Sequence, residues 1–228
     1  MPSKPALRYE LKYQINEGEH IILAQLLDAM LKRDPNGDKY NDYRVRSLYF
    51  DTYDNESLTE KMDGVPERRK YRIRIYNNRD KQIRLECKKK VGDLTSKESV
   101  EIPRDLAEQL IARDTAGLLK TGEPLLHQMF YELTVRQSKP VVIVDYIREA
   151  YLFPTEDVRI TFDKQLRSGL YSIDLFNPFI PLIDPFPSPT IILEVKFNRA
   201  LAMHIKDLLC SIRAMRQAFS KYTICRCV

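Results

Sequence analysis

Strict alternation of charged and apolar residues over two neighbouring segments constrains the fold of this chain more than any other feature. The segment 70–76 reads KYRIRIY, so Lys70, Arg72 and Arg74 share one face and the apolar side chains share the other. The segment 82–90, QIRLECKKK, repeats the pattern after a turn-like stretch at 77–80. Two such segments predict a β-hairpin with one basic face. Because like charges on neighbouring strands destabilise a sheet, this face points to an anionic ligand.

The positive charge is concentrated around this hairpin. The whole chain carries a formal net charge of +5, but the segment 61–104 holds 14 basic and seven acidic residues and is therefore +7. The remainder is slightly acidic, so the basicity belongs to one surface. The alternative is a set of solvent-exposed ion-pair ladders, each of which would contribute little.

Further alternating segments extend the sheet. Strands are expected at 8–13, 45–53, 96–102, 141–148, 158–163 and 191–197, and helices at 17–31, 104–113, 125–135 and 200–219. The charged faces would lie in water in a sandwich, or line a lumen if the sheet closes. Cations and carboxylates occur together on the charged faces of several strands, which favours a lumen because they could bind an anion and a metal together. The predicted fold class is α+β: an antiparallel β-tunnel, a closed barrel of about eight strands with helices packed on the outside, forming one domain over 1–228.

Several classes of protein are excluded by what the sequence lacks. It has no P-loop, no Gly-x-Gly-x-x-Gly and only seven glycines, so a phosphate would have to be held by side chains. No Ser/His/Asp or Cys/His set is evident, and too few aromatic residues flank the basic run for a nucleic-acid platform. No apolar run is long enough to insert into a membrane. Four unevenly spaced cysteines and the lack of a signal peptide predict a cytoplasmic protein.

The charged faces supply the parts of a phosphate-transfer site. Phosphoryl transfer needs little beyond positioning and charge neutralisation, for which cations and a metal held by carboxylates suffice. The candidate phosphate-binding cations are Lys12, Arg46, Arg72, Arg74, Lys88, Lys97, Arg148, Arg159, Lys196 and Lys221. The candidate metal ligands are Glu10, Glu86, Asp163 and Glu194.

Nine short motifs, in chain order, carry a family resemblance. They are Glu10-x-Lys12, Arg46-Ser-Leu-Tyr-Phe-Asp-Thr52, Arg72-Ile-Arg74-x-Tyr76, Leu85-Glu86-x-Lys88, Lys97-Glu98, Tyr146-x-Arg148-x-Ala-Tyr151, Val158-Arg-Ile-Thr-Phe-Asp163, Leu193-Glu-Val-Lys196 and Ser220-Lys221-Tyr222. Together they span about residues 7–223 and resemble the VTC domain. This is the polyphosphate polymerase domain of the triphosphate tunnel metalloenzyme (CYTH-like) superfamily.

The resemblance implies a basic tunnel in which the γ-phosphate of ATP is moved onto polyphosphate with Mn²⁺ or Mg²⁺. It implies that Arg72 and Arg74 grip the triphosphate and that Glu194 binds the metal. Lys88, Arg148 and Arg159 are expected to act in catalysis with the two arginines. We expect a stand-alone, bacterial-type member, for which export of the polymer would need a separate membrane protein. Hydrolysis of tripolyphosphate or a nucleoside triphosphate, and non-catalytic binding of a polyanion, remain alternatives.

Overall fold

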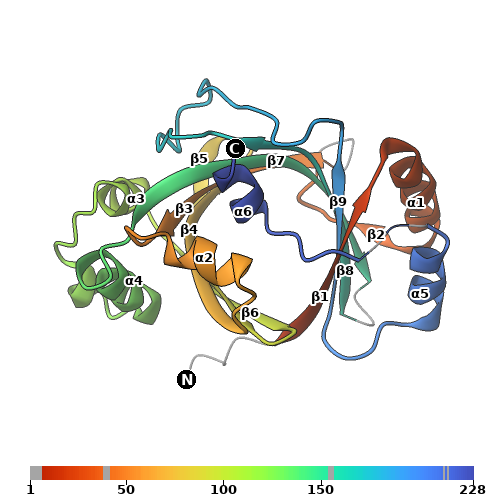
Figure 1. Cartoon of the computed structure of the whole chain (residues 1–228), viewed down its shortest axis with the longest axis horizontal. Coiled ribbons are helices and arrows are strands. Elements are labelled where there is room, and N and C mark those ends of the chain that lie inside the picture. The colour runs from red at the N-terminus through yellow and green to blue at the C-terminus, as the bar shows by residue number, and fades with distance from the viewer. Residues whose placement is uncertain (1–6, 38–41, 154–156, 213, 215) are drawn as a thin grey trace.

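Eight antiparallel strands close into a ring in the computed structural model, which describes residues 7–37, 42–153, 157–212, 214 and 216–228. The ring is seen end-on in Figure 1. Its order is β7 (Lys139–Phe153), β3 (Asp42–Asp51), β4 (Glu67–Tyr76), β5 (Arg79–Val91), β6 (Leu94–Glu101), β1 (Arg8–Ile15), β9 (Ile191–Phe197) and β8 (Val158–Ser168), which pairs back to β7. The short β2 (Lys32–Arg33) adds to β7. The expected closed antiparallel tunnel is therefore confirmed.

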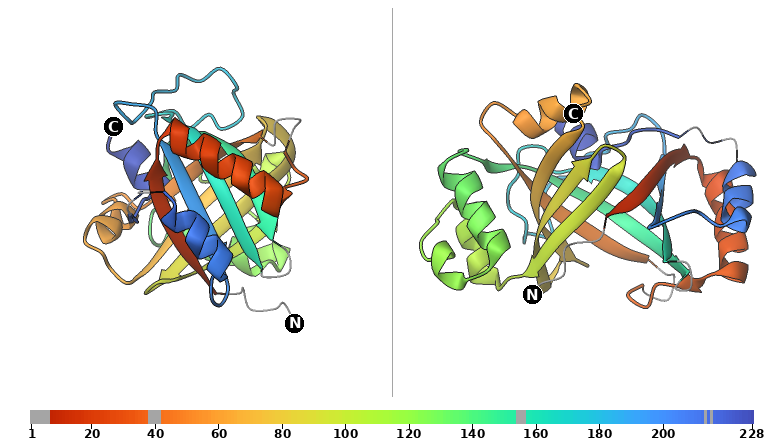
Figure 2. Two further views of the ribbon diagram at one scale, coloured as in Figure 1. Left: turned by 90° about the vertical axis from the view of Figure 1, so that its right-hand side faces the viewer. Right: turned by 90° about the horizontal axis from the view of Figure 1, so that it is seen from below.

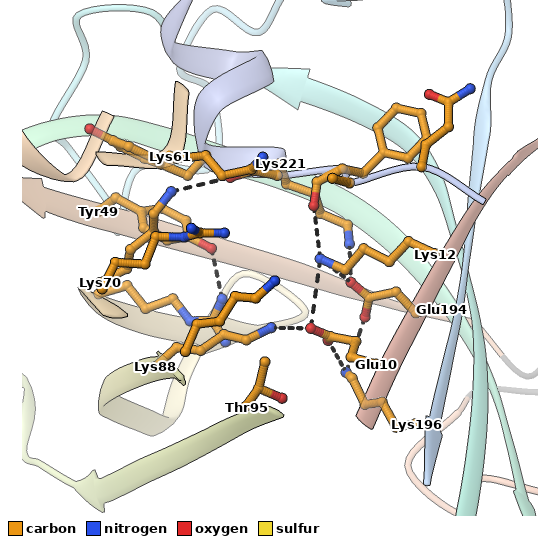
Figure 3. Close-up of a pocket in the computed structure, with 18 of the residues that line it drawn as sticks. Glu10, Lys12, Tyr49, Lys61, Lys70, Lys88, Thr95, Glu194, Lys196 and Lys221 are labelled. Atoms are coloured by element: carbon orange, nitrogen blue, oxygen red, sulfur yellow. Dashed lines mark hydrogen bonds and ion pairs between the residues drawn. The ribbon is translucent and has the colours of Figure 1, made fainter. Parts of the chain in front are cut away.

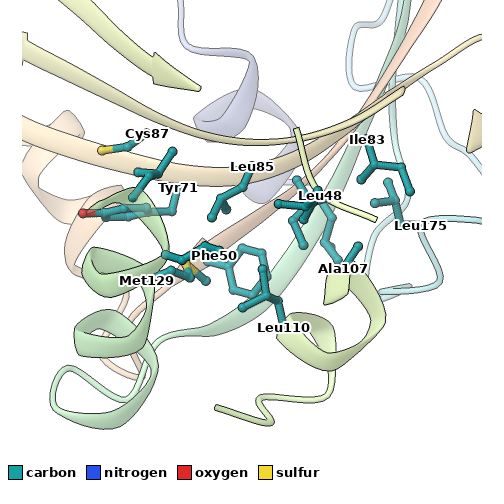
Figure 4. Packing of buried hydrophobic residues seen from close by; sticks show 14 of the residues in the cluster. Leu48, Phe50, Tyr71, Ile83, Leu85, Cys87, Ala107, Leu110, Met129 and Leu175 are labelled. Carbon is teal, nitrogen blue, oxygen red and sulfur yellow. The ribbon is translucent and has the colours of Figure 1, made fainter. Parts of the chain in front are cut away.

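Two large apolar clusters lie outside the ring, beneath the helices, and a third includes inward-facing residues such as Val45 and Ile192. On one side, α3 (Arg104–Ile111), the 3₁₀ helix η1 (Leu118–Thr121) and α4 (Pro124–Thr134) cover the outer faces of β3, β4 and β5. Leu48 and Leu85 are fully buried there against Leu110 and Met129 (Figure 4). Because alternate side chains of a strand point to opposite faces, burying these apolar residues outside turns the charged residues inward.

A second apolar cluster covers the opposite side of the barrel. There α1 (Glu17–Met30) and α5 (Met203–Cys210) lie side by side over β1, β8 and β9 (Figure 2). Leu23 and Leu27 of α1 pack with Phe162 and Leu193. The expected cap of α1 is present: the side chain of Asn16 accepts a hydrogen bond from the amide of Glu19, and Glu19 caps in return.

The C-terminal region departs from the expected helix over 200–219. The helix α5 ends at Cys210, and residues 216–220, just before α6 (Lys221–Arg226), cross one mouth of the barrel instead. The Gln217 amide donates to the Lys12 carbonyl over 2.9 Å, and Arg216 forms a bridge with Tyr13. Contact with an exposed edge of β1 thus overrides local helix propensity. The helix α2 (Glu56–Met62) was also not expected, and it lies at the same mouth.

No helix in the described part of the chain has the length and apolar character needed to cross a membrane.

A buried carboxylate on the outer face of β7 makes the fold sensitive to acid. Glu149 accepts from the Tyr151 hydroxyl, and its other oxygen lies 2.7 Å from His20 Nε2 and 3.1 Å from Lys164 Nζ. Burial alone would raise the pKa of Glu149, but these contacts outweigh it and lower the pKa to about 2. Since the folded pKa lies below the unfolded value, Glu149 stabilises the fold above about pH 4.5, and that contribution is lost as the pH falls toward 2.

Glu149→Gln is expected to remove this pH-dependent stability, on the order of 2 kcal/mol. Urea unfolding at about pH 6 and pH 3 measures it: the difference between the two pH values should shrink in the variant. Glu108→Gln, on the exposed face of α3, serves as the control and should behave as the wild type. An unchanged difference in Glu149→Gln would contradict the assignment.

Candidate active site in the barrel

A cavity of about 420 Å³ occupies the end of the barrel beside α2 and α6. Strands β1, β3, β4, β5, β6, β7 and β9 contribute to its wall, together with α2 and the segment 216–222. Most of the polar side chains that reach it are cationic (Figure 3). The structure brings nine of the predicted site residues to this wall: Glu10, Lys12, Arg72, Arg74, Lys88, Arg148, Glu194, Lys196 and Lys221.

Two arginines of β4 are fixed around a central carboxylate. Glu86 of β5 is fully buried and lies directly opposite Arg72 in the register. Its Oε2 accepts from Arg72 Nε over 2.8 Å and lies 3.5 Å from Arg74, while its Oε1 lies 2.7 Å from Lys97 Nζ. Burial opposes ionisation, but these three cations outweigh it and hold the pKa of Glu86 well below its usual range. Arg72 also donates to the Tyr49 hydroxyl over 2.7 Å, so its guanidinium has little freedom.

A second fixed cation comes from β7. Arg148 makes a two-pronged contact with Asp163 of β8, at 2.6 and 2.8 Å, which is the geometry of a strong charge-assisted pair. Lys221, at the start of α6, lies 2.5 Å from the same carboxylate and 3.0 Å from Glu194. The motif Ser220-Lys221-Tyr222 therefore brings a cation from outside the strands into the cavity.

Flexible lysines and carboxylates alternate across β1 and β9. Lys12 is paired with Glu194 and Glu10 with Lys196 in the register, so opposite charges face each other. Lys12 Nζ lies 3.3 Å and Lys196 Nζ 3.0 Å from Glu194, and Lys88 Nζ lies 2.6 Å from Glu10 (Figure 3). Despite burial, the lysines hold the pKa values of both carboxylates below their usual range. Both glutamates are thus ionised beside exchangeable lysines.

Five cations that line the cavity were not among the predicted site residues, and one of them is Arg216 in the segment 216–222. Arg68, Lys70 and Lys90 extend the inward faces of β4 and β5, and α2 adds Lys61. Simple alternation from Arg72 would have found Arg68 and Lys70. Lys61 could not have been found this way, because no pattern in 55–69 predicts α2. Arg69 lies in a separate groove outside the barrel.

Arg46 does not reach the cavity, and its prediction as a phosphate ligand is wrong. It is fully buried on the outer face of β3, where Nε donates to Asp145 over 2.8 Å and NH1 donates to the Asn177 carbonyl over 2.6 Å. The parity of the strand gives the reason: Arg46 shares its face with Leu48 and Phe50, which pack beneath the outer helices.

Arg159 and Lys97 lie away from the first cavity as well. Both line a second cavity of about 430 Å³, together with Arg79, Lys81 and Arg84. Arg159 is held there by Asp34 and by the Tyr43 hydroxyl, at 2.5 and 2.8 Å. Along β4, Tyr76 of this second cavity is at the opposite end from Arg68, so the two cavities open toward opposite ends of the barrel.

The model of the VTC domain matches residues 7–228, which is nearly the whole sequence. This chain belongs to the VTC domain family. No curated protein matches the sequence significantly. Among solved structures, the putative adenylyl cyclase HpAC1 from Hippeastrum, described as having a dominant triphosphatase activity, is similar with a TM-score of 0.60 and 15% identity over 97% of this chain and 95% of that one. A putative adenylate cyclase from Vibrio parahaemolyticus has a TM-score of 0.51 and 12% identity, over 97% and 98%. At these identities the likeness concerns the tunnel fold.

The four carboxylates of this VTC domain differ in their suitability for a metal. An arginine fork fixes Asp163, and Glu86 is held through Oε2 by Arg72 and through Oε1 by Lys97, so these two carboxylates are less free to bind a metal than Glu10 and Glu194. Glu10 and Glu194 face lysines, which are flexible and can move onto a phosphate. Glu10 Oε1 is buried and accepts no hydrogen bond from a described residue.

Glu10 and Glu194 therefore fit a hard divalent cation. Among the described residues, no three His, Cys, Asp or Glu side chains group into a metal site. Two carboxylates completed by phosphate oxygens are a usual way to bind Mg²⁺.

Proposed function

We propose that this VTC domain is a metal-dependent phosphotransferase that moves the γ-phosphate of ATP onto a polyphosphate chain. The observation that supports it most is the cavity itself, whose cations come from five strands, β1, β4, β5, β7 and β9, as well as from α2 and α6. Such a wall can surround a linear polyanion, whereas a surface patch contacts only one side of it. Membership of the VTC family supports the same choice of substrate.

The proposed reaction needs no protein nucleophile. A terminal oxygen of polyphosphate attacks the γ-phosphorus, the bond from that phosphorus to the β–γ bridging oxygen breaks, and ADP leaves. Arg72 and Arg74 hold the triphosphate, and Arg148, fixed by Asp163, neutralises charge on the transferred group. Lys12, Lys88, Lys196 and Lys221 exchange their carboxylate partners for phosphate oxygens. Arg159 and Lys97 line the second cavity, and Lys97 takes part in the site by holding Glu86.

A metal held by Glu10 and Glu194 would neutralise charge on the phosphates. The residues of the chain orient the substrate around it. Either Mn²⁺ or Mg²⁺ suits carboxylate and phosphate oxygens.

Hydrolysis is the second candidate, supported by the fold shared with a protein of dominant triphosphatase activity. In that reaction water replaces polyphosphate as the acceptor, and the same cations hold the triphosphate. The two reactions differ only in whether an acceptor chain can reach the γ-phosphorus.

Product analysis separates the candidates. Purified protein is incubated with ATP and Mn²⁺ or Mg²⁺, and long-chain polyphosphate, ADP and free phosphate are measured. Polymer with equimolar ADP is the expected result. Free phosphate without polymer would indicate that the protein is a hydrolase and not a polymerase. Binding of ATP or polyphosphate without turnover would indicate a polyanion-binding module.

Glu194→Gln is expected to retain ATP binding but to slow turnover by about a hundredfold or more, because a neutral amide cannot replace a carboxylate as a metal ligand. Binding should be equal to or tighter than that of the wild type, since an anion is lost from a cationic wall. Titration calorimetry and turnover are measured in parallel, with Glu108→Gln as the surface control. Turnover within threefold of the wild type would remove Glu194 from the metal site.

A further inference from the structure

Eleven of the twelve cations that line the first cavity divide into two groups, and the twelfth, Arg216, belongs to the segment 216–222. Those of the waist (Lys12, Arg72, Arg74, Lys88, Arg148, Lys196 and Lys221) each lie within 4 Å of a carboxylate. The four at the α2 mouth make no ion pair with any described carboxylate: Lys61, Arg68, Lys70 and Lys90. We call these four residues the α2 corner. Together with Arg216, they are the cations of this wall that have no described carboxylate within 4 Å.

The register of β4 and β5 makes this corner electrostatically unfavourable. Arg68 faces Lys90, and Lys70 faces Lys88, so two like-charged pairs follow one another along the hairpin. Like charges directly opposite one another destabilise a sheet. On β1 and β9, by contrast, each lysine faces a glutamate. Other like-charged pairs occur in the register, such as Arg74 with Arg84 and Lys88 with Lys97, but each of those four cations has a carboxylate within 4 Å. The cations of the corner have none among the described residues, which indicates a ligand that supplies the missing anions.

Lys70 is the most enclosed member of the corner. Its Nζ donates to the Ser220 hydroxyl over 3.2 Å and lies 4.3 Å from the centre of the Tyr222 ring. Burial, with the charge of Arg68, lowers the pKa of Lys70 to about 7. The charged groups that face it from the surrounding elements are Arg68 on β4, Lys88 on β5, Lys61 and Glu60 on α2, Lys12 on β1 and Asp51 on β3. The positive neighbours outnumber the two carboxylates, so an anion would be stabilised here.

We propose that the α2 corner is a separate subsite for linear phosphate chains, which binds the part of the chain that extends beyond the triphosphate held at Arg72 and Arg74. The path that we assign to the phosphate chain rests on the proposed function, whereas the affinity of the corner for phosphate rests only on the charges of its side chains. Successive inward residues of β4 are about 7 Å apart, so Lys70 and Arg68 continue the row from Arg72 toward the mouth. A ligand longer than tripolyphosphate can reach both the waist and the corner.

The proposal predicts a dependence of affinity on chain length. In Lys70→Gln/Lys90→Gln, affinity for long-chain polyphosphate should fall about tenfold, the size of one charge-assisted hydrogen bond. Affinity for tripolyphosphate should change less than about threefold. The control is Lys120→Gln/Lys206→Gln, which removes the same charge from the outer surface of the barrel. Titration calorimetry without ATP measures the affinity of the wild type and of each variant for both ligands, so the result does not depend on turnover.

Two further readouts separate a binding role from a structural one. At about pH 8, binding of polyphosphate should be accompanied by the uptake of a proton by Lys70. The double variant should therefore take up fewer protons than the wild type. Calorimetry repeated in buffers of different ionisation enthalpy measures this uptake. Without ligand, the melting temperature of the double variant should equal or exceed that of the wild type, because the repulsion between neighbouring cations of the corner has been reduced. The subsite would be overturned if the double variant lost affinity equally for polyphosphate and tripolyphosphate, or lost none. A lower melting temperature together with unchanged proton uptake would also overturn it. Absence of polymer synthesis would instead overturn the proposed function alone.

Discussion

Arg72→Ala is expected to weaken the binding of ATP and tripolyphosphate by about a hundredfold or more. The guanidinium lies in the middle of the cavity wall and is held rigid by Glu86 and the Tyr49 hydroxyl. A preorganised, largely buried arginine that loses its anion contacts typically changes affinity by about 2–5 kcal/mol. Arg72→Lys should recover only part of the affinity, because a lysine cannot reproduce the two-pronged contact.

Folding should largely survive this change. Glu86 keeps Lys97 at 2.7 Å and Arg74 at 3.5 Å, so its carboxylate is not left without a cation. Arg104→Ala, on exposed α3, is the matched control and should bind as the wild type. Titration calorimetry measures affinity, and circular dichroism verifies the fold. Affinity within threefold of the wild type in Arg72→Ala would show that the triphosphate is not held at the waist.

Glu86→Gln is expected to act in opposite directions on stability and on anion binding. The change leaves Arg72, Arg74 and Lys97 around a neutral amide inside the barrel. Removing one partner from a buried charge cluster typically lowers the free energy of unfolding by about 3–5 kcal/mol. A bound polyanion supplies the missing negative charge, so tripolyphosphate should raise the melting temperature of this variant more than that of the wild type.

The matched control for this variant is Glu101→Gln on β6. Glu101 is an exposed partner of Arg84, so its loss should lower stability by less than about 1 kcal/mol. Urea unfolding with and without tripolyphosphate gives both quantities. If Glu86→Gln is as stable as Glu101→Gln, or is stabilised less than the wild type by tripolyphosphate, the central carboxylate does not hold the cations together as described.

Alternation was enough to predict the barrel and much of its lining. The hairpin of β4 and β5 has its charged face inside, as the pattern of Arg72, Arg74 and Glu86 suggested. The pattern alone left two choices, a sandwich or a closed sheet. Whether a charged face lines a lumen depends on pairings between strands that lie far apart in the chain, such as β1 with β9 and β3 with β7, which local sequence does not encode.

The errors at the site have physical causes. Arg46 was assigned by its charge, although Leu48 and Phe50 on the same parity mark an outer face. Arg159 and Lys97 do face inward and lie opposite Lys196 and Lys88 in the register. Their side chains are held by Asp34 and Glu86, however, and line the second cavity. The mouth depends on α2 and on the segment 216–220, whose conformations are set by tertiary contacts such as that of Gln217 with β1. Such contacts leave little trace in local periodicity.

A crystal structure with tripolyphosphate bound tests the central claim most directly, because that claim places the phosphates inside the barrel. We expect the phosphate chain in the first cavity, with oxygens in contact with Arg72, Arg74 and Arg148 and with Lys12 or Lys196 moved from Glu194 onto the ligand. Tripolyphosphate bound only on the outer surface, with the ion pairs of the waist unchanged, would contradict it.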